Sequence, residues 1–133
     1  MTRSELREHI FYMLFRIEFN PPEEMLEQVE LYINSLGDIK EKDSTYMVGK
    51  YKHIVEHLNE IDEALNEQTE GWKTSRMNKV DLTILRLAVY EMKWDEEVPT
   101  GVAINEAVEL SKKFSSDDGP AFVNGVLAKF TKE

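Results

Sequence analysis

The segment from Val80 to Trp94 constrains the fold of this chain more than any other. Its apolar residues recur around most of the circumference of a helix: Val80, Leu82, Ile84, Leu85, Leu87, Ala88, Val89 and Met92. A helix that is apolar on nearly every side is stable only when other elements surround it. We therefore expect a central, buried helix here. Its polar or amphipathic residues fall on one strip, made of Thr83, Arg86, Tyr90 and Lys93.

Helical periodicity also marks the segments on both sides. A T-x-x-E capping box at Thr2 and Glu5 predicts a first helix over about residues 3–18, with an apolar stripe of Leu6, Ile10, Met13, Leu14 and Ile17. A second helix is expected over about 22–36, with Leu26, Val29 and Ile33 buried and Gly37 as its stop. A third carries an apolar residue every three or four positions between Met47 and Leu65, with a break expected near residues 58–59.

Two more helices complete the pattern, over residues 100–114 and from about Pro120 onward, the last one capped by Asp118. No segment has the alternation of a strand. We predict an all-α protein of about seven helices in two packed bundles. The whole of 1–133 is expected to form a single domain, with an N-terminal half of about 1–70 and a C-terminal half of about 71–133.

The absence of cysteine and the acidic charge exclude several classes of protein. Without cysteine there is no disulfide framework, thiolate zinc site or cysteine nucleophile. No segment reads as a signal peptide or a membrane span, so we expect a cytoplasmic protein with no membrane partner. The net charge of -10 argues against nonspecific nucleic-acid binding, although residues 1–16 and 71–94 are each slightly basic.

The residues that catalysis or metal binding would need are not arranged for it. The pair His53 and His57 lacks an H-E-x-x-H frame, and we interpret it as part of a helix surface. No glycine-rich phosphate loop is present. Glu91 falls on the apolar circumference of the central helix, where we expect a structural polar contact. We predict a binding protein, not an enzyme, with no cofactor and no metal.

The first helix carries a different set of side chains. Arg3 and Arg7 lie one turn apart beside the apolar stripe, and Phe11 and Phe15 continue along that edge. Guanidinium groups next to aromatic rings can grip single-stranded RNA through phosphate pairing and base stacking. The same four residues also fit solvent-exposed charge and core packing, so the pattern alone leaves both interpretations open.

A longer string of residues occurs between Trp72 and Leu127. Its parts are Trp72-x-x-x-Arg76, Val80-Asp81, the run 84–91, Val98-Pro99, the run 102–110, Lys112 and the run 122–127 (Phe-Val-Asn-Gly-Val-Leu). In this order and spacing they resemble the C-terminal half of the NusB family of transcription antitermination factors. The N-terminal half is similar in length and in its opening helix.

The resemblance implies two helical bundles without catalysis. It implies binding of boxA-type RNA in ribosomal RNA leaders together with NusE, a small-subunit ribosomal protein, in support of the transcription elongation complex. When the roles of the family's residues are transferred to the matching positions, the resemblance implies that Arg3, Arg7 and Phe122 bind RNA. It implies that Phe15 and Asp81 bind the partner.

The chain also departs from the family pattern. Ser4 and Glu5 stand where family members often carry a basic run, so we expect RNA affinity to depend on NusE. Asp117 and Asp118 would cap the last helix and could also repel RNA. The alternatives are a protein-interaction module with little intrinsic RNA binding, and an accessory domain of an RNA methyltransferase, which we expect less for a chain of 133 residues. A homodimer that covers the arginine face is compatible with each of these.

Overall fold

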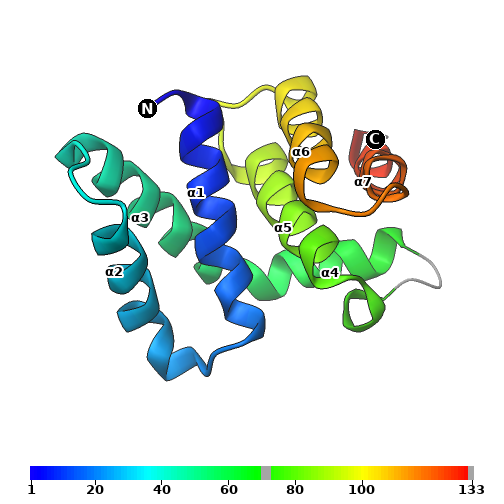
Figure 1. Ribbon diagram of the computed structural model, residues 1–133. Helices are drawn as coiled ribbons and strands as arrows, with labels where there is room; N and C mark the ends of the chain where they lie inside the picture. Colours follow the sequence, from blue (N-terminus) through cyan, green and yellow to red (C-terminus); the bar gives the residue numbers. More distant parts are fainter. Residues whose placement is uncertain (70–72, 132–133) are drawn as a thin grey trace. The chain divides into compact units, whose positions relative to one another are not determined.

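The computed structural model describes residues 1–69 and 73–131, and in that part of the chain it contains seven α-helices and no strand (Figure 1). The all-α prediction is therefore confirmed. The helices fall into two compact units, Met1–Val55 and Glu56–Glu133. The boundary between these two units falls at residues 55–56, whereas the sequence suggested two halves of one domain divided at about residue 70. The helix before that point belongs to the second unit, because its Asp62 is ion-paired to Arg86 and the carbonyl of its Gln68 accepts from Lys129.

The first unit is built from α1 (Arg3–Phe15), α2 (Met25–Ser35) and α3 (Glu41–Glu56), the last residue of α3 lying across the boundary. Short 3-10 turns at Arg16–Glu18 and Pro22–Glu24 link α1 to α2. The core of α1 is the predicted stripe of Leu6, Ile10, Met13 and Leu14, while Ile17 is half-buried. Gly37 follows α2 with a φ of 76°, as expected for a helix-ending glycine.

The buried face of α2 differs from the prediction. Leu26 is 61% exposed, whereas Met25 and Val29 are buried. The α-helix begins only at Met25, after the 3-10 turn, and its inward stripe runs through Met25, Val29 and Tyr32. Tyr32 contacts His9 of α1, with 2.6 Å between the phenolic oxygen and Nδ1. That contact fixes which side of α2 faces α1, and Leu26 lies off that side.

The second unit contains α4 (Leu58–Gln68), α5 (Lys79–Trp94), α6 (Thr100–Phe114) and α7 (Gly119–Ala128). The expected break in the third predicted helix occurs at His57, between α3 and α4. In α5, every residue from Asp81 to Glu91 is buried, which confirms the central helix. On the polar or amphipathic strip of this helix, Thr83, Arg86 and Tyr90 are buried and Lys93 is exposed. Trp72 lies outside the described residues.

Side chains of the second unit contact both ends of α5. Asn78 caps the helix, its Oδ1 accepting from the backbone N–H groups of Val80 and Asp81. The ring of His57 lies against those of Tyr90 and Trp94, with centroid distances of 5.9 and 4.4 Å. His57 is therefore half-buried in an aromatic cluster, not a surface residue as expected, while His53 is exposed.

Candidate functional site

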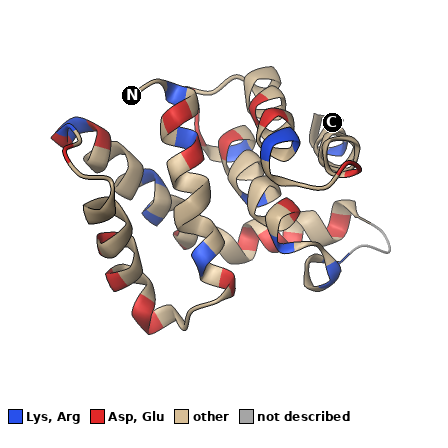
Figure 2. Ribbon diagram, in the orientation of Figure 1, with Lys and Arg blue, Asp and Glu red and all other residues tan. Residues whose placement is uncertain are grey.

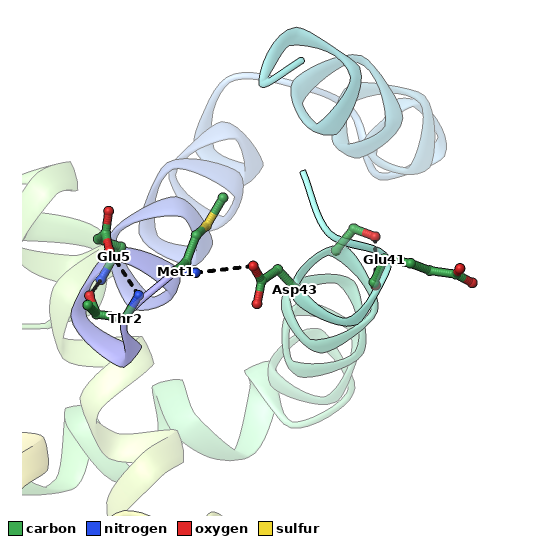
Figure 3. Close-up of polar contacts among 6 residues, drawn as sticks. Met1, Thr2, Glu5, Glu41 and Asp43 are labelled. Atoms are coloured by element: carbon green, nitrogen blue, oxygen red, sulfur yellow. Dashed lines mark hydrogen bonds and ion pairs between the residues drawn. The ribbon is translucent and has the colours of Figure 1, made fainter. Parts of the chain in front are cut away.

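The start of α1 is fixed by a reciprocal pair of hydrogen bonds. The Thr2 hydroxyl accepts from the Glu5 N–H at 3.1 Å, and the Glu5 carboxylate accepts from the Thr2 N–H at 2.9 Å (Figure 3). These bonds favour the charged carboxylate and lower the pKa of Glu5. The Met1 amino group lies 3.3 Å from Oδ2 of Asp43, at the start of α3. The first turn of α1 is thereby attached to α3, and the capping box read from the sequence is confirmed.

Arg3 is the first residue of α1 and is exposed. Its Cζ lies 4.9 Å from the centroid of the Tyr46 ring on α3. The Lys50 Nζ lies 3.4 Å from the Tyr46 hydroxyl oxygen and 5.7 Å from the same ring centroid. Basic and acidic residues alternate along the start of α1, whereas the charged residues of α2 are acidic (Figure 2). One aromatic ring on α3 therefore contacts two cationic side chains, of which Lys50 is one turn away on the same helix and Arg3 comes from α1.

Arg7, one turn farther along α1, has a different environment. Only 6% of its surface is exposed, so it belongs to the packed part of the first unit. A phosphate would reach its guanidinium only after local rearrangement. The sequence predicted the same RNA-binding role for both arginines, but they differ in accessibility. Arg3 is exposed to a ligand and Arg7 is buried.

The other end of α1 carries a row of aromatic rings. Phe15 is half-buried between Phe11, at a centroid distance of 6.1 Å, and Phe19, at 5.0 Å. Phe19 itself is 63% exposed. The row gives the predicted partner residue Phe15 an exposed aromatic neighbour. The spacing of four residues from Phe11 to Phe15 to Phe19 is the sequence signal for this row, although Phe19 lies beyond the end of α1.

In the second unit, the predicted partner residue Asp81 is buried, 7% exposed. Its Oδ1 accepts a hydrogen bond from the Ser115 hydroxyl at 2.6 Å. Ser115 in turn lies against Gly119, the first residue of α7, so closely that a Cβ there would collide with its side chain. The Asp81 carboxylate thus ties α5 to the α6–α7 loop. Its position within the packing leaves little surface for a partner.

Phe122 lies in the first turns of α7 and is half-buried, while Asp117 and Asp118 before it are exposed. Asp118 occupies the predicted N-cap position, but its side chain makes no capping hydrogen bond. A groove of about 550 Å³ lies between α6 and α7, lined by Gly101, Ile104, Asn105, Val108, Pro120, Ala121 and Asn124. The start of α7 therefore combines an aromatic side chain, two carboxylates and a groove.

The five predicted site residues divide between the units. Arg3, Arg7 and Phe15 belong to the first unit, and Asp81 and Phe122 belong to the second. Across residues 1–69 and 73–131 no cluster of three His, Cys, Asp or Glu side chains is arranged to hold a metal ion. No helix in the described ranges is long and apolar enough to cross a membrane.

Comparison with known proteins extends these observations. Residues 4–132 match the NusB family. The transcription antitermination protein NusB of Agathobacter rectalis is 52% identical over 130 residues, which cover 98% of this chain and 99% of the relative. The NusB protein of Lachnoclostridium phytofermentans is also 52% identical, covering 97% and 98% of the two chains. The chain belongs to the NusB family, which confirms the resemblance seen in the motif string.

Solved structures support the same fold. NusB of T. maritima superposes with a TM-score of 0.86 at 31% identity, covering all of this chain and 92% of that one. A complex of the antitermination factors NusB and NusE with double-stranded RNA contains a chain with a TM-score of 0.82 at 24% identity, covering 99% of this chain and 98% of that one. At that identity the second likeness bears on the fold alone.

Proposed function

We propose that this chain is a transcription antitermination factor that binds boxA-type leader RNA together with NusE and so supports processive transcription of ribosomal RNA operons. The observation that carries the proposal is the match over nearly the full length to relatives that are half identical and are named transcription antitermination proteins. The role is one of binding, without catalysis, and the working assembly includes the transcription elongation complex.

The exposed residues favour one RNA contact within the first unit. Arg3 is accessible, carries a full positive charge and is held at the start of α1, so its N–H donors suit a phosphate oxygen. Arg7 supports the proposal less directly, because it is buried. We therefore assign the phosphate contact to Arg3 and keep Arg7 as a predicted contributor that acts from within the helix packing.

Phe122 and Phe15 complete the proposed surfaces. Phe122 is half-buried at the start of α7, where part of its ring can stack on or pack against an RNA base. Phe15 is half-buried and extends to the exposed ring of Phe19, which is the kind of aromatic surface that protein partners cover. Asp81 is proposed to act on the partner surface through the loop that it fixes, because the carboxylate itself is bonded to Ser115.

The test is fluorescence anisotropy of a labelled boxA-type RNA, titrated with the protein alone and with NusE. Removing one phosphate contact to single-stranded RNA should lower the slope of log affinity against log salt by about 0.7. We expect that loss for Arg3→Ala. Arg7→Met, which keeps the volume of the side chain without its charge, should change the slope less.

Lys52→Ala provides the matched control, because Lys52 is an exposed base on α3 of the same unit and lies in no proposed contact. It should leave the salt slope at the wild-type value. An equal loss for Lys52→Ala and Arg3→Ala would mean that net charge, not a contact, governs binding. No RNA binding even with NusE would refute the proposal in favour of a protein-interaction module.

A further inference from the structure

Tyr46 has no role in the surfaces described so far, yet it contacts the proposed RNA-binding arginine. It lies on α3, far from Arg3 in sequence, and its ring centroid is 4.9 Å from the guanidinium carbon. The ring is half-buried, so it is neither part of the hydrophobic core nor fully in solvent. Both residues belong to the first unit. This placement suits a contact that acts on the position of Arg3.

The geometry of a guanidinium allows it to contact a ring and a phosphate at the same time. Its flat face stacks on an aromatic ring, whereas its N–H donors lie at the edge of the plane and suit phosphate oxygens. A long arginine side chain at a helix start would otherwise lose much of its rotamer freedom when it binds RNA. Contact with Tyr46 restricts that freedom beforehand, so less is lost on binding.

Lys50 lies against the same tyrosine. It lies one helical turn after Tyr46 on α3 and is only 7% exposed. Its ammonium group is 3.4 Å from the Tyr46 hydroxyl oxygen, at hydrogen-bond distance. The phenol is thus attached to its own helix at one end, while its ring supports Arg3. The two cations also add positive charge around the ring in a unit whose second helix is acidic.

We propose that Tyr46 is a positioning residue for RNA binding: it holds the Arg3 guanidinium in the orientation that meets a phosphate of single-stranded RNA. The inference rests on the proposed function and adds to it a residue from a helix that the family resemblance did not implicate. It assigns to Tyr46 an effect that passes through Arg3, with no contact between Tyr46 and RNA.

The experiment is a double-mutant cycle on Arg3 and Tyr46, read by anisotropy of the labelled boxA-type RNA in the presence of NusE. Tyr46→Leu removes the ring and should weaken binding about two- to fivefold, the range for an exposed cation–π contact. Tyr46→Phe keeps the ring and should bind within about 1.5-fold of wild type. In the Arg3→Ala background, Tyr46→Leu should cause no further loss.

The salt dependence separates positioning from charge. Because Tyr46→Leu removes no charge, its salt slope should equal that of wild type, whereas Arg3→Ala lowers the slope by about 0.7. Thermal unfolding of each variant shows whether the fold is intact. Should Tyr46→Leu fail to fold, Tyr46→Met, which also removes the ring and no charge, takes its place in the same cycle, and a loss that is equally large in the Arg3→Ala background overturns the positioning role.

Two results would refute the positioning role while leaving the proposed function in place. One is a Tyr46→Leu effect of the same size with and without Arg3, which would mean that Tyr46 contacts RNA itself or acts through the fold. The other is wild-type affinity for Tyr46→Leu beside a clear loss for Arg3→Ala. If wild-type protein with NusE binds no RNA, the proposed function fails and the positioning role fails with it.

Discussion

Arg86 and Asp62 form a two-point ion pair that ties the central helix α5 to α4. Nε and Nη2 of Arg86 donate to the two carboxylate oxygens of Asp62 at 2.9 and 2.8 Å. The Arg86 side chain is 9% exposed and that of Asp62 is 25% exposed. This two-point arrangement gives a largely buried guanidinium a carboxylate of opposite charge.

Removing the carboxylate should therefore be costly. We expect Asp62→Ala to lower the free energy of unfolding by about 2 to 3 kcal/mol, less than for a fully buried pair because Asp62 is partly solvated. Arg86→Lys keeps the charge but loses the fork, and should cost about 1 kcal/mol. Urea unfolding measures both. Glu63→Ala removes an exposed carboxylate from the same helix and should be near neutral, and an equal cost for it would contradict the assignment.

Gly119 should tolerate no side chain. A Cβ there would collide with the Ser115 hydroxyl, which is bonded to Asp81, so Gly119→Ala should destabilise the protein by about 1 to 3 kcal/mol. Gly125→Ala, also in α7 but with open space around it, should instead be stabilising by roughly 0.5 to 1 kcal/mol. Thermal or urea unfolding checks the pair. Ser115→Gly should restore part of the loss in Gly119→Ala, and absence of rescue would show that the strain lies elsewhere.

Tyr32 should make the stability depend on alkaline pH. Burial raises the pKa of its phenol from 10.0 to about 12, with Tyr12 and Glu8 adding to the rise and Arg16 opposing it. The unfolded chain ionises at the lower pKa, so this contribution to stability is complete below pH 10 and is lost as the pH rises from about 10 to about 12. Urea unfolding across this range should show the fall, and it should be smaller in Tyr32→Phe.

Tyrosinate absorbance provides an independent check on Tyr32. The component that titrates near pH 12 should disappear in Tyr32→Phe and persist in Tyr51→Phe, although burial also raises the pKa of Tyr51. Persistence of the component in Tyr32→Phe would show that the shifted group is another residue.

Asp117 and Asp118 should limit RNA affinity if Phe122 meets RNA. Both carboxylates are exposed at the start of α7, where they repel phosphate. We expect Asp117→Asn with Asp118→Asn to raise affinity for boxA-type RNA roughly two- to fivefold at low salt and less at high salt. Anisotropy provides the measurement. Glu96→Gln with Glu97→Gln, an exposed pair in the same unit, should have a smaller effect, and an equal gain would point to net charge alone.

Local pattern was enough to place most of the helices. The span Thr100–Phe114 was predicted to the residue, Gly37 ends α2 as expected, and the break near Leu58 occurs one residue earlier. These features depend on apolar spacing, proline, glycine and capping residues, whose preferences act within one or two helical turns. The motif string likewise identified the family, because it is a property of order and spacing.

The environments of the individual site residues required the packed structure. Arg3 and Arg7 carry the same guanidinium group and lie on adjacent turns of α1, yet Arg3 is exposed and Arg7 is buried. Nothing in the local sequence of Arg3 indicates Tyr46, and nothing around Asp81 indicates Ser115. A helical period gives the direction in which a side chain points, but its neighbour comes from another helix and depends on how the two pack.

The central helix α5 separates what the sequence determines from what the tertiary structure determines. Its apolar circumference alone determined that α5 is buried, because so much apolar surface must be removed from water. Only the packing decided which polar groups are buried with it. Arg86, for example, is bonded to the Asp62 carboxylate, which belongs to α4. A buried charge is stable when its partner is present, and that partner is supplied by the fold.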